Sequence, residues 1–368
     1  MNTFINVEDI GNLQQALAEA QEIKNDRFKY QHLGKNKTLL MIFFNNSLRT
    51  RLSTQKAAMN LGMNVIVLDV NAGAWKLETE RGVIMDGDKS EHLLEAIPVM
   101  GCYCDLIGVR SFAGLTDREY DYAETVLNQF IKYSGRPVFA METATVHPLQ
   151  AFADLITIEE HKTKARPKVV MSWAPHCRAL PQAVPNSFAQ WMNAADVDFV
   201  ITHPKGYELD PKFVGNARVE YDQMKALEGA DFVYAKNWSC PGVTNPADYG
   251  KILSKDMSWT IDETHILIDT YQKMKYDDDY RMVVLGNLKY IRGIIQNVGN
   301  GEYWFNPLGD PAYEVDETLG INGIVSENGL LKGNVYSVDG VMVRKAGEFA
   351  NGLTKGLYIV NGKKIAIK

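Results

Sequence analysis

The sequence predicts an α/β protein with two doubly wound parallel-sheet lobes and an atypical, β-rich C-terminal tail. Short apolar runs, typical of buried strands, alternate with amphipathic helical stretches as far as about residue 262. This alternation indicates parallel strands joined by helices that cover both faces of each sheet. Beyond that point Gly, Asn and Asp become frequent and the alternation stops. A chain of 368 residues is long enough for two lobes of this kind.

The first lobe is predicted from its apolar periodicity. Val7–Lys24 carries apolar residues on one helical face, and Leu39–Phe44 is an apolar run that ends at two asparagines. The other predicted strands are Asn64–Val70, Cys104–Val109 and Pro137–Met141, and the other helices are Ser47–Leu61, Glu91–Met100 and Glu119–Tyr133.

A second alternating unit begins at Pro167, after a helix predicted over Ala151–His161. Its strands are Lys168–Ser172, Asp198–Thr202 and Asp231–Ala235, and its helices are Ser187–Ala194 and Tyr221–Leu227. Two lobes joined by a helix leave a cleft between the carboxyl ends of their strands. Ligands of open α/β sheets bind at such ends.

The tail has a different character. A helix over Glu263–Lys275, a strand over Arg281–Leu285 and a helix over Asn287–Gly301 are predicted first. Val335–Arg344 and Gly356–Lys368 then read as hairpins, because Asp-Gly and Asn-Gly turns lie between alternating residues.

Composition describes an ordinary globular protein, with 46% hydrophobic and 23% charged residues. The formal net charge of -6 argues against a non-specific nucleic-acid binder. The four cysteines lack the spacing of a disulfide framework or a zinc array, which favours a reducing, cytoplasmic location. No apolar run approaches the roughly 20 residues of a membrane span, and the N-terminus does not resemble a signal peptide. The glycines form no P-loop and no GxGxxG motif, which disfavours nucleotide binding.

The strongest functional signal is Ser47-Leu48-Arg49-Thr50-Arg51, which follows a predicted strand and opens a helix. Backbone N–H groups at a helix start have no intrahelical partner, and the helix dipole favours an anion there. Arginine donates two parallel hydrogen bonds to phosphate and stays charged. We therefore predict a phosphate site on which two arginines and two hydroxyls converge. A capped surface helix with solvated arginines is the alternative.

A second signal is His147-Pro148-Leu149-Gln150, at a predicted strand-to-helix turn. Pro148 keeps His147 out of the α-helical region. A neutral imidazole and an amide at this place can polarise a carbonyl oxygen on which negative charge develops. A structural histidine is the alternative. Arg110, at the end of another predicted strand, is a further candidate anion ligand, or else a solvated surface residue.

Several weaker candidates lie elsewhere in the chain. Trp75 lies with Lys76 in a polar loop, where an aromatic side chain could close a site in this subunit or a neighbour. Lys236, at the end of a second-lobe strand, could bind a carboxylate. The remaining candidates are Glu142, His176 and Arg178.

Taken together, the Ser47 and His147 motifs resemble the two carbamoyl-phosphate signatures of the aspartate/ornithine carbamoyltransferase superfamily. The segments Lys37–Val70, Gly73–Val99, Trp173–Phe188 and Lys236-Asn237-Trp238 resemble its N-acylornithine branch, most closely the N-succinylornithine members. The resemblance covers roughly residues 1–262. It implies a cytoplasmic homotrimer in arginine biosynthesis, with active sites between subunits, no metal or organic cofactor, and no nucleic-acid or membrane partner.

The resemblance also implies site residues. His147, Arg110 and Arg49 would be the catalytic set. Carbamoyl phosphate would be bound by Ser47, Leu48, Arg49, Thr50, Arg110, His147 and Gln150, with Trp75 reaching in from a neighbouring subunit. Acylornithine would be held by Glu142, His176, Lys236 and Ser90. The implied reaction is attack by the δ-amine on the carbamoyl carbon, with phosphate leaving.

Ser90 bears on the acyl group of the acceptor. By the resemblance, the matching residue is typically Glu in acetylornithine enzymes and Pro in succinylornithine enzymes. A glutamate would repel a succinyl carboxylate, whereas serine is small and uncharged. We therefore expect N-succinyl-L-ornithine as the acceptor, with N-acetylornithine as the alternative.

The C-terminal part departs from the family. The implied domains are a carbamoyl-phosphate-binding domain at residues 1–150, a truncated acylornithine-binding domain at 151–262 and a non-family tail at 263–368. The family's His-Cys-Leu-Pro signature is absent from the sequence. Tyr336–Lys368 instead resembles the sorting tails of proteins exported by the type IX secretion route. A non-catalytic carbamoyl-phosphate-binding protein or a fusion protein is therefore an alternative.

Overall fold

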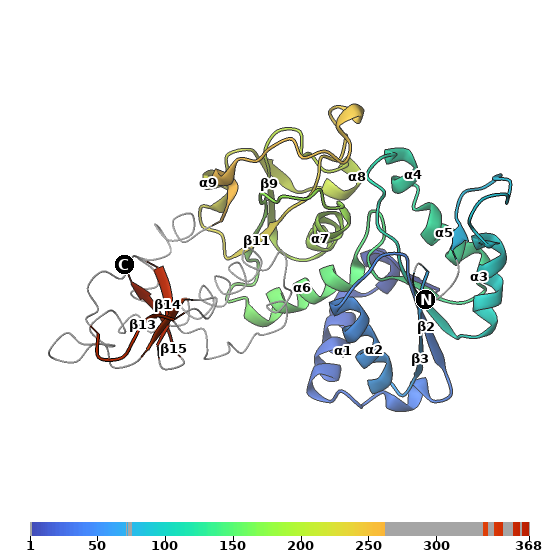
Figure 1. Cartoon of the computed structure of the whole chain (residues 1–368). Coiled ribbons are helices and arrows are strands. Elements are labelled where there is room, and N and C mark those ends of the chain that lie inside the picture. Colours follow the sequence, from blue (N-terminus) through green and yellow to red (C-terminus); the bar gives the residue numbers. More distant parts are fainter. Residues whose placement is uncertain are drawn as a thin grey trace. The chain divides into compact units, whose positions relative to one another are not determined.

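The computed structural model describes residues 2–70, 72, 76–261, 334–337, 342–348, 356–360 and 363–367 (Figure 1). The chain divides into two compact units, Met1–Trp304 and Phe305–Lys368. Among its described residues, the first unit contains a five-stranded and a four-stranded parallel sheet, each at the centre of one lobe, and a separate pair of two-residue strands.

The first lobe is built on a five-stranded parallel sheet in the order β1-β7-β6-β2-β3. Its strands are β1 (Thr3–Phe4), β2 (Thr38–Phe43), β3 (Asn64–Asp69), β6 (Leu106–Arg110) and β7 (Val138–Ala140). Its helices are α1 (Leu13–Asn25), α2 (Arg49–Asn60), α3 (Leu93–Cys102), α4 (Arg118–Tyr122) and α5 (Thr125–Tyr133). Two short strands, β4 (Leu77–Glu78) and β5 (Glu91–His92), pair with each other.

Both faces of this sheet are covered, as the apolar strands predict. Leu40 and Ile42 of β2 pack in one cluster with residues of α3 and α5. Leu39 and Met41, which point to the opposite face, pack in another cluster with Ala58 of α2. Figure 1 shows α2 on one side of β2 and β3, and α3 and α5 on the other. The doubly wound prediction is confirmed for this lobe.

Two predicted helices are interrupted. The stretch from Val7 is a 3-10 turn, Val7–Ile10, followed by α1, because Gly11 has φ 69° and Asn12 caps the new helix by accepting from the Gln15 amide at 3.0 Å. The stretch Glu119–Tyr133 is broken between α4 and α5 by Glu124, whose φ is 48°. The residues before Leu93 pair as β5 instead of opening a helix.

The second lobe is built on a four-stranded parallel sheet in the order β10-β9-β8-β11. Its strands are β8 (Lys168–Trp173), β9 (Asp198–Thr202), β10 (Arg218–Glu220) and β11 (Phe232–Lys236). Its helices are α7 (Ala183–Ala194), α8 (Pro211–Val214) and α9 (Gln223–Leu227), and α6 (Pro148–His161) leads in from the first lobe. Further 3-10 turns are Gln31–Gly34, Pro246–Asp248 and Met257–Trp259. The three predicted strands are confirmed, whereas α8, β1 and β10 were not predicted because each is only two to four residues long.

The second unit contains a four-stranded antiparallel sheet in the order β13-β12-β14-β15. Its strands are β12 (Val335–Ser337), β13 (Met342–Arg344), β14 (Gly356–Val360) and β15 (Lys363–Ile367). Both predicted hairpins are confirmed. The elements predicted between residues 263 and 301 lie outside the described residues.

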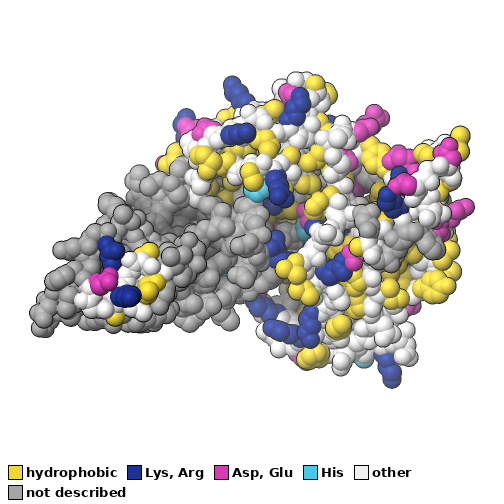
Figure 2. Space-filling model, viewed as in Figure 1, with side chains coloured by type: hydrophobic (Ala, Val, Ile, Leu, Met, Phe, Trp, Pro, Cys, Tyr) yellow, Lys and Arg dark blue, Asp and Glu magenta, His cyan; other side chains and the backbone are white. Residues whose placement is uncertain are grey.

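Side chains of both charges are interspersed with apolar and neutral ones on the face drawn in Figure 2, which fits the modest net charge. Among the helices that the structure describes, none is long and apolar enough for a membrane span.

Candidate active site

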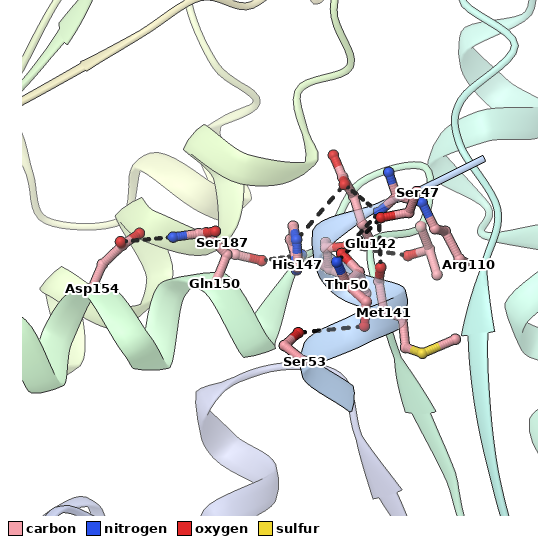
Figure 3. Close-up of polar contacts among 12 residues, drawn as sticks. Ser47, Thr50, Ser53, Arg110, Met141, Glu142, His147, Gln150, Asp154 and Ser187 are labelled. Atoms are coloured by element: carbon pink, nitrogen blue, oxygen red, sulfur yellow. Dashed lines mark hydrogen bonds and ion pairs between the residues drawn. The ribbon is translucent and has the colours of Figure 1, made fainter. Parts of the chain in front are cut away.

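The candidate site lies at the carboxyl ends of the central strands of the first lobe. Hydrogen bonds continue between the strands beyond the ends of β2 and β6: the Phe44 amide donates to the Arg110 carbonyl at 2.9 Å, and the Ser111 amide donates to the Glu142 carbonyl at 3.1 Å. The residues that follow β2, β6 and β7 therefore lie side by side. This register brings Arg110 and Glu142 together with the first turn of α2 (Figure 3).

Arg110 is nearly buried and makes three hydrogen bonds through one nitrogen. Its Nη1 donates to Glu142 Oε2 at 2.7 Å, to the Met141 carbonyl at 3.2 Å and to Thr50 Oγ1 at 3.4 Å. The guanidinium also lies 4.4 Å from the centre of the Phe112 ring. Its Nε is buried and has no hydrogen-bond partner among the described residues. A buried donor without a partner is a natural contact for a ligand oxygen.

His147 lies on the other side of Glu142. Its Nε2 is 3.6 Å from Glu142 Oε2, and its backbone N–H donates to Ser187 Oγ of the second lobe at 2.7 Å. With φ −142° and ψ 70°, His147 is outside the α-helical region, as predicted, and α6 begins at Pro148, before the predicted helix start at Ala151. Burial lowers the pKa of His147 to about 4, and the positive charges of Arg110 and Lys236 act in the same direction against Glu142. The imidazole is therefore neutral at pH 7.

Glu142 is the centre of the cluster. Burial would raise the pKa of its carboxyl group, but His147, Arg110 and Lys236 together hold it below the ordinary value. Its φ of 89° is rare for a residue with a side chain. Such strain persists where the surrounding structure fixes the backbone, often at functional sites.

Lys236 and Arg49 complete the charge cluster. Lys236 ends β11 of the second lobe, and burial lowers its pKa while Glu142 opposes that shift. Burial also lowers the pKa of Arg49, again with Glu142 opposing and Arg110 reinforcing the shift. Arg110 thus contacts the Glu142 carboxylate directly, and the positive charges of Lys236 from the second lobe and of Arg49 from the first interact with it electrostatically. Their positive excess suits a dianion.

The predicted phosphate loop forms a hollow of about 440 Å³, lined by Asn46, Ser47, Leu48 and Arg51. Ser47 Oγ accepts from the Thr50 amide at 3.2 Å, so α2 begins at Arg49 instead of Ser47. We expected Arg49 and Arg51 to converge on one point, but the two side chains have different partners. Arg51 pairs with Asp69 at the end of β3, whereas Arg49 joins the Glu142 cluster.

The other predicted residues are placed differently. Gln150 lies in the first turn of α6, and its Nε2 donates to Asp154 Oδ1 at 2.8 Å. His176 lies after β8, where its Nδ1 accepts from the Arg178 amide at 3.0 Å. Ser90 is exposed beside β5, and its amide donates to the Lys76 carbonyl at 3.1 Å. The described contacts of His176 and Ser90 are local and do not join the Glu142 cluster. Trp75 lies outside the described residues.

Supporting residues of the site were not predicted. Glu124 Oε1 accepts from Thr143 Oγ1, the Thr145 amide and Thr145 Oγ1 at 2.6 to 2.8 Å, and thereby holds the segment between Glu142 and His147. Asp154 supports Gln150 in the same way. The four-residue spacing of Gln150 and Asp154 was a usable signal, since residues so spaced meet on a helix. No sequence signal pointed to the contacts of Glu124, because they join segments that are distant along the chain.

Comparison with known proteins identifies the family. A model of the aspartate/ornithine carbamoyltransferase, carbamoyl-P binding domain, matches residues 2–160. N-succinylornithine carbamoyltransferase of Bacteroides fragilis is 75% identical over 268 residues, which are 73% of this chain and 83% of that protein. The chain belongs to the aspartate/ornithine carbamoyltransferase family. The family resemblance and the α/β carbamoyltransferase fold predicted from the sequence are thus confirmed.

Other members of the carbamoyltransferase family are more distant. N-acetylornithine carbamoyltransferase of Xylella fastidiosa is 37% identical over 255 residues, covering 64% of this chain and 74% of that protein. A solved structure of a glutamate-to-serine variant of N-acetyl-L-ornithine transcarbamylase, complexed with carbamyl phosphate and N-succinyl-L-norvaline, is 34% identical with a TM-score of 0.62. It covers 67% of this chain and 80% of that one. Acetylornithine transcarbamylase complexed with acetylcitrulline has a TM-score of 0.66 at 32% identity, covering 73% and 85%.

Proposed function

We propose that this carbamoyltransferase moves the carbamoyl group of carbamoyl phosphate to the δ-amine of N-succinyl-L-ornithine, giving N-succinylcitrulline and phosphate. The observation that carries the proposal is the identity of 75% and 74% to two N-succinylornithine carbamoyltransferases, over 83% of their length. In the proposal, the charged cluster around Glu142 is the site of this reaction.

The phosphate end of the substrate is assigned to the first turn of α2 and to Arg110. Ser47, Leu48, Arg49 and Thr50 offer backbone N–H groups, hydroxyls and a guanidinium where the helix dipole is positive. Arg110 offers its buried Nε. In the proposal, Trp75 of a neighbouring subunit adds a contact to the same ligand.

The carbamoyl end is assigned to His147 and Gln150. The neutral δ-amine attacks the carbamoyl carbon, so that a C–N bond forms and the carbonyl oxygen becomes negative. The bond from carbon to the phosphate oxygen then breaks, phosphate leaves, and the proton that the nitrogen gives up passes to the departing phosphate. Fixed donors on both the carbonyl oxygen and the departing phosphate stabilise this charge. In the proposal, His147 and Arg110 supply these donors.

The acceptor is assigned to the second lobe. Lys236 and His176 would bind its carboxylates, and Glu142 would face its ammonium or amine group. Ser90 adds no negative charge that would repel a succinyl carboxylate. This favours the succinyl acceptor over N-acetylornithine. The related glutamate-to-serine variant with bound N-succinyl-L-norvaline supports this assignment.

A product assay with both acceptors tests the proposal. The full chain is incubated with carbamoyl phosphate and either N-succinyl-L-ornithine or N-acetyl-L-ornithine, and the acylcitrulline is measured by mass spectrometry. We expect a higher kcat/KM for the succinyl substrate. A higher value for the acetyl substrate would overturn the acceptor assignment. Absence of both products would overturn the enzyme proposal.

The broader setting belongs to the same proposal. We infer a cytoplasmic homotrimer that acts in arginine biosynthesis, with the carbamoyl-phosphate site in residues 1–150 and the acceptor site in residues 151–262. Trp75 would then complete a neighbour's site. Sedimentation of the purified chain tests the trimer, since a monomer that retains full activity would contradict it.

A second function is favoured by one sequence observation. His-Cys-Leu-Pro, the family signature that would contribute to the acceptor and carbamoyl contacts, is absent from all 368 residues. The chain would then bind carbamoyl phosphate without turning it over. Isothermal titration beside the product assay separates the two functions, because binding without product supports only the second.

A further inference from the structure

The amide of Gln150 is held by a neighbouring carboxylate. Its Nε2 donates to Asp154 Oδ1 at 2.8 Å, one turn further along α6 (Figure 3). Asp154 is only 6% exposed, and its negative charge acts on the partly buried Lys236. An ionised carboxylate accepts hydrogen bonds and donates none. The Gln150 amide must therefore turn its nitrogen to Asp154 and keep its oxygen for other contacts.

The orientation of this amide matters for the carbamoyl group. That group ends in a carbonyl oxygen, which needs a donor, and an NH2, which needs an acceptor. The oxygen of Gln150 can accept from the NH2. It gains nothing from the methyl group of an acetyl phosphate, which is close to the same size but cannot donate. A site built to hydrogen-bond an NH discriminates strongly against an analogue that lacks it.

We propose that Asp154 is a specificity-determining positioning residue, which fixes the Gln150 amide so that the site selects a carbamoyl phosphate over an acetyl phosphate. The inference rests on the proposed binding of carbamoyl phosphate. In this proposal Asp154 acts only through Gln150 and does not itself touch the reacting atoms.

Isothermal titration of the full chain with carbamoyl phosphate and with acetyl phosphate tests this inference. We expect the wild-type chain to bind carbamoyl phosphate at least about tenfold more tightly, the scale of one lost hydrogen bond. In Asp154→Asn the new side chain both donates and accepts, so the Gln150 amide can turn. The ratio of the two affinities should fall several-fold. Asp154→Ser, which also donates and accepts, provides a second variant should the first fail to fold.

The matched control is Asp231→Asn. Asp231 is a largely buried aspartate of the second lobe that accepts from the Lys168 amide at 2.8 Å. Its variant should retain the wild-type affinity ratio. An unchanged ratio in a folded Asp154 variant, or a wild-type chain that binds both phosphates equally, would overturn the inference and leave the proposed function standing. A wild-type chain that fails to bind carbamoyl phosphate would overturn the proposed function, and the inference with it.

Discussion

The neutral state of His147 has a consequence for stability. Its pKa is about 4 in the folded protein, because of burial, and about 6.5 in an unfolded chain. Between these values the unfolded state binds a proton that the folded state excludes. The contribution of His147 to the free energy of unfolding is therefore fully present above pH 6.5. It is lost as the pH falls from 6.5 through 4. The loss amounts to at most about 3 kcal/mol.

His147→Gln removes this titration. We expect the variant's Tm to fall less than the wild-type Tm between pH 6.5 and pH 4, as measured by circular dichroism at half-unit steps. His32→Gln, a change at an exposed histidine, is the control and should follow the wild type. Parallel curves for wild type and His147→Gln would contradict the buried, neutral imidazole.

Variants of the Arg110–Glu142 pair can distinguish an effect on the stability of the fold from an effect on the binding of carbamoyl phosphate. Arg110→Gln leaves Glu142 without its hydrogen-bonded cation, which should destabilise the fold by about 3 kcal/mol in urea unfolding. Adding Glu142→Gln removes the unpaired charge and should recover most of that loss. Affinity for carbamoyl phosphate, measured by titration, should remain reduced by at least about a hundredfold, because charge-assisted bonds to phosphate are strong. Full recovery of affinity in the double variant would show that Arg110 is not a ligand.

At the scale of elements, the segment between β7 and α6 places Glu142 and His147. Three hydrogen bonds to Glu124 hold it from α5, and Asn186 Nδ2 of α7 donates to the Thr145 carbonyl at 3.1 Å. Burial raises the pKa of Glu124, while its bonds to Thr145 and Thr143 oppose the shift. The break between α4 and α5 serves this contact, since the αL conformation of Glu124 starts α5 there. The sequence of residues 119–133 alone therefore favoured one continuous helix.

Glu124→Ala should loosen this segment. The variant loses three hydrogen bonds from a partly buried carboxylate to the buried Thr143 and Thr145, so we expect the free energy of unfolding to fall by about 2 to 4 kcal/mol. Carbamoyl phosphate should bind more weakly, since His147 is no longer fixed. Glu119→Ala, at an exposed position of α4, is the control and should change neither quantity. A Glu124→Ala chain with wild-type stability in urea would refute the anchoring role.

For the whole molecule, the sequence could predict features that depend on neighbouring residues, but it could not predict contacts between residues far apart along the chain. Apolar runs such as Leu39–Phe44 and Asp198–Thr202 located the central strands, because a strand buried on both faces is continuously apolar. The motifs at Ser47 and His147 pointed to the candidate site, since both follow strand ends. Contacts between the lobes could not be predicted. Asp121 and Tyr249 are far apart in sequence, yet Tyr249 donates from its hydroxyl to Asp121 at 2.8 Å.

The contact between Arg118 and Asp210 joins the two lobes and can be measured. Arg118 Nη2 lies 2.5 Å from Asp210 Oδ2, its Nε donates to the Pro241 carbonyl at 2.8 Å, and its guanidinium stacks on Tyr122. Asp210 also caps α8. Single alanine variants therefore remove more than the pair, whereas a double-mutant cycle isolates it.

The cycle of Arg118→Ala and Asp210→Ala should give a coupling free energy of about 1 kcal/mol in urea unfolding, because the pair is partly exposed. Repeating the cycle in about 1 M salt should reduce the coupling, since the screening length then falls to about 3 Å. A coupling that is zero at low salt would mean that the aromatic and backbone contacts hold the lobes together without this ion pair. A coupling that survives high salt would assign it to the short hydrogen bond between the two side chains, with little contribution from the longer-range attraction of their charges.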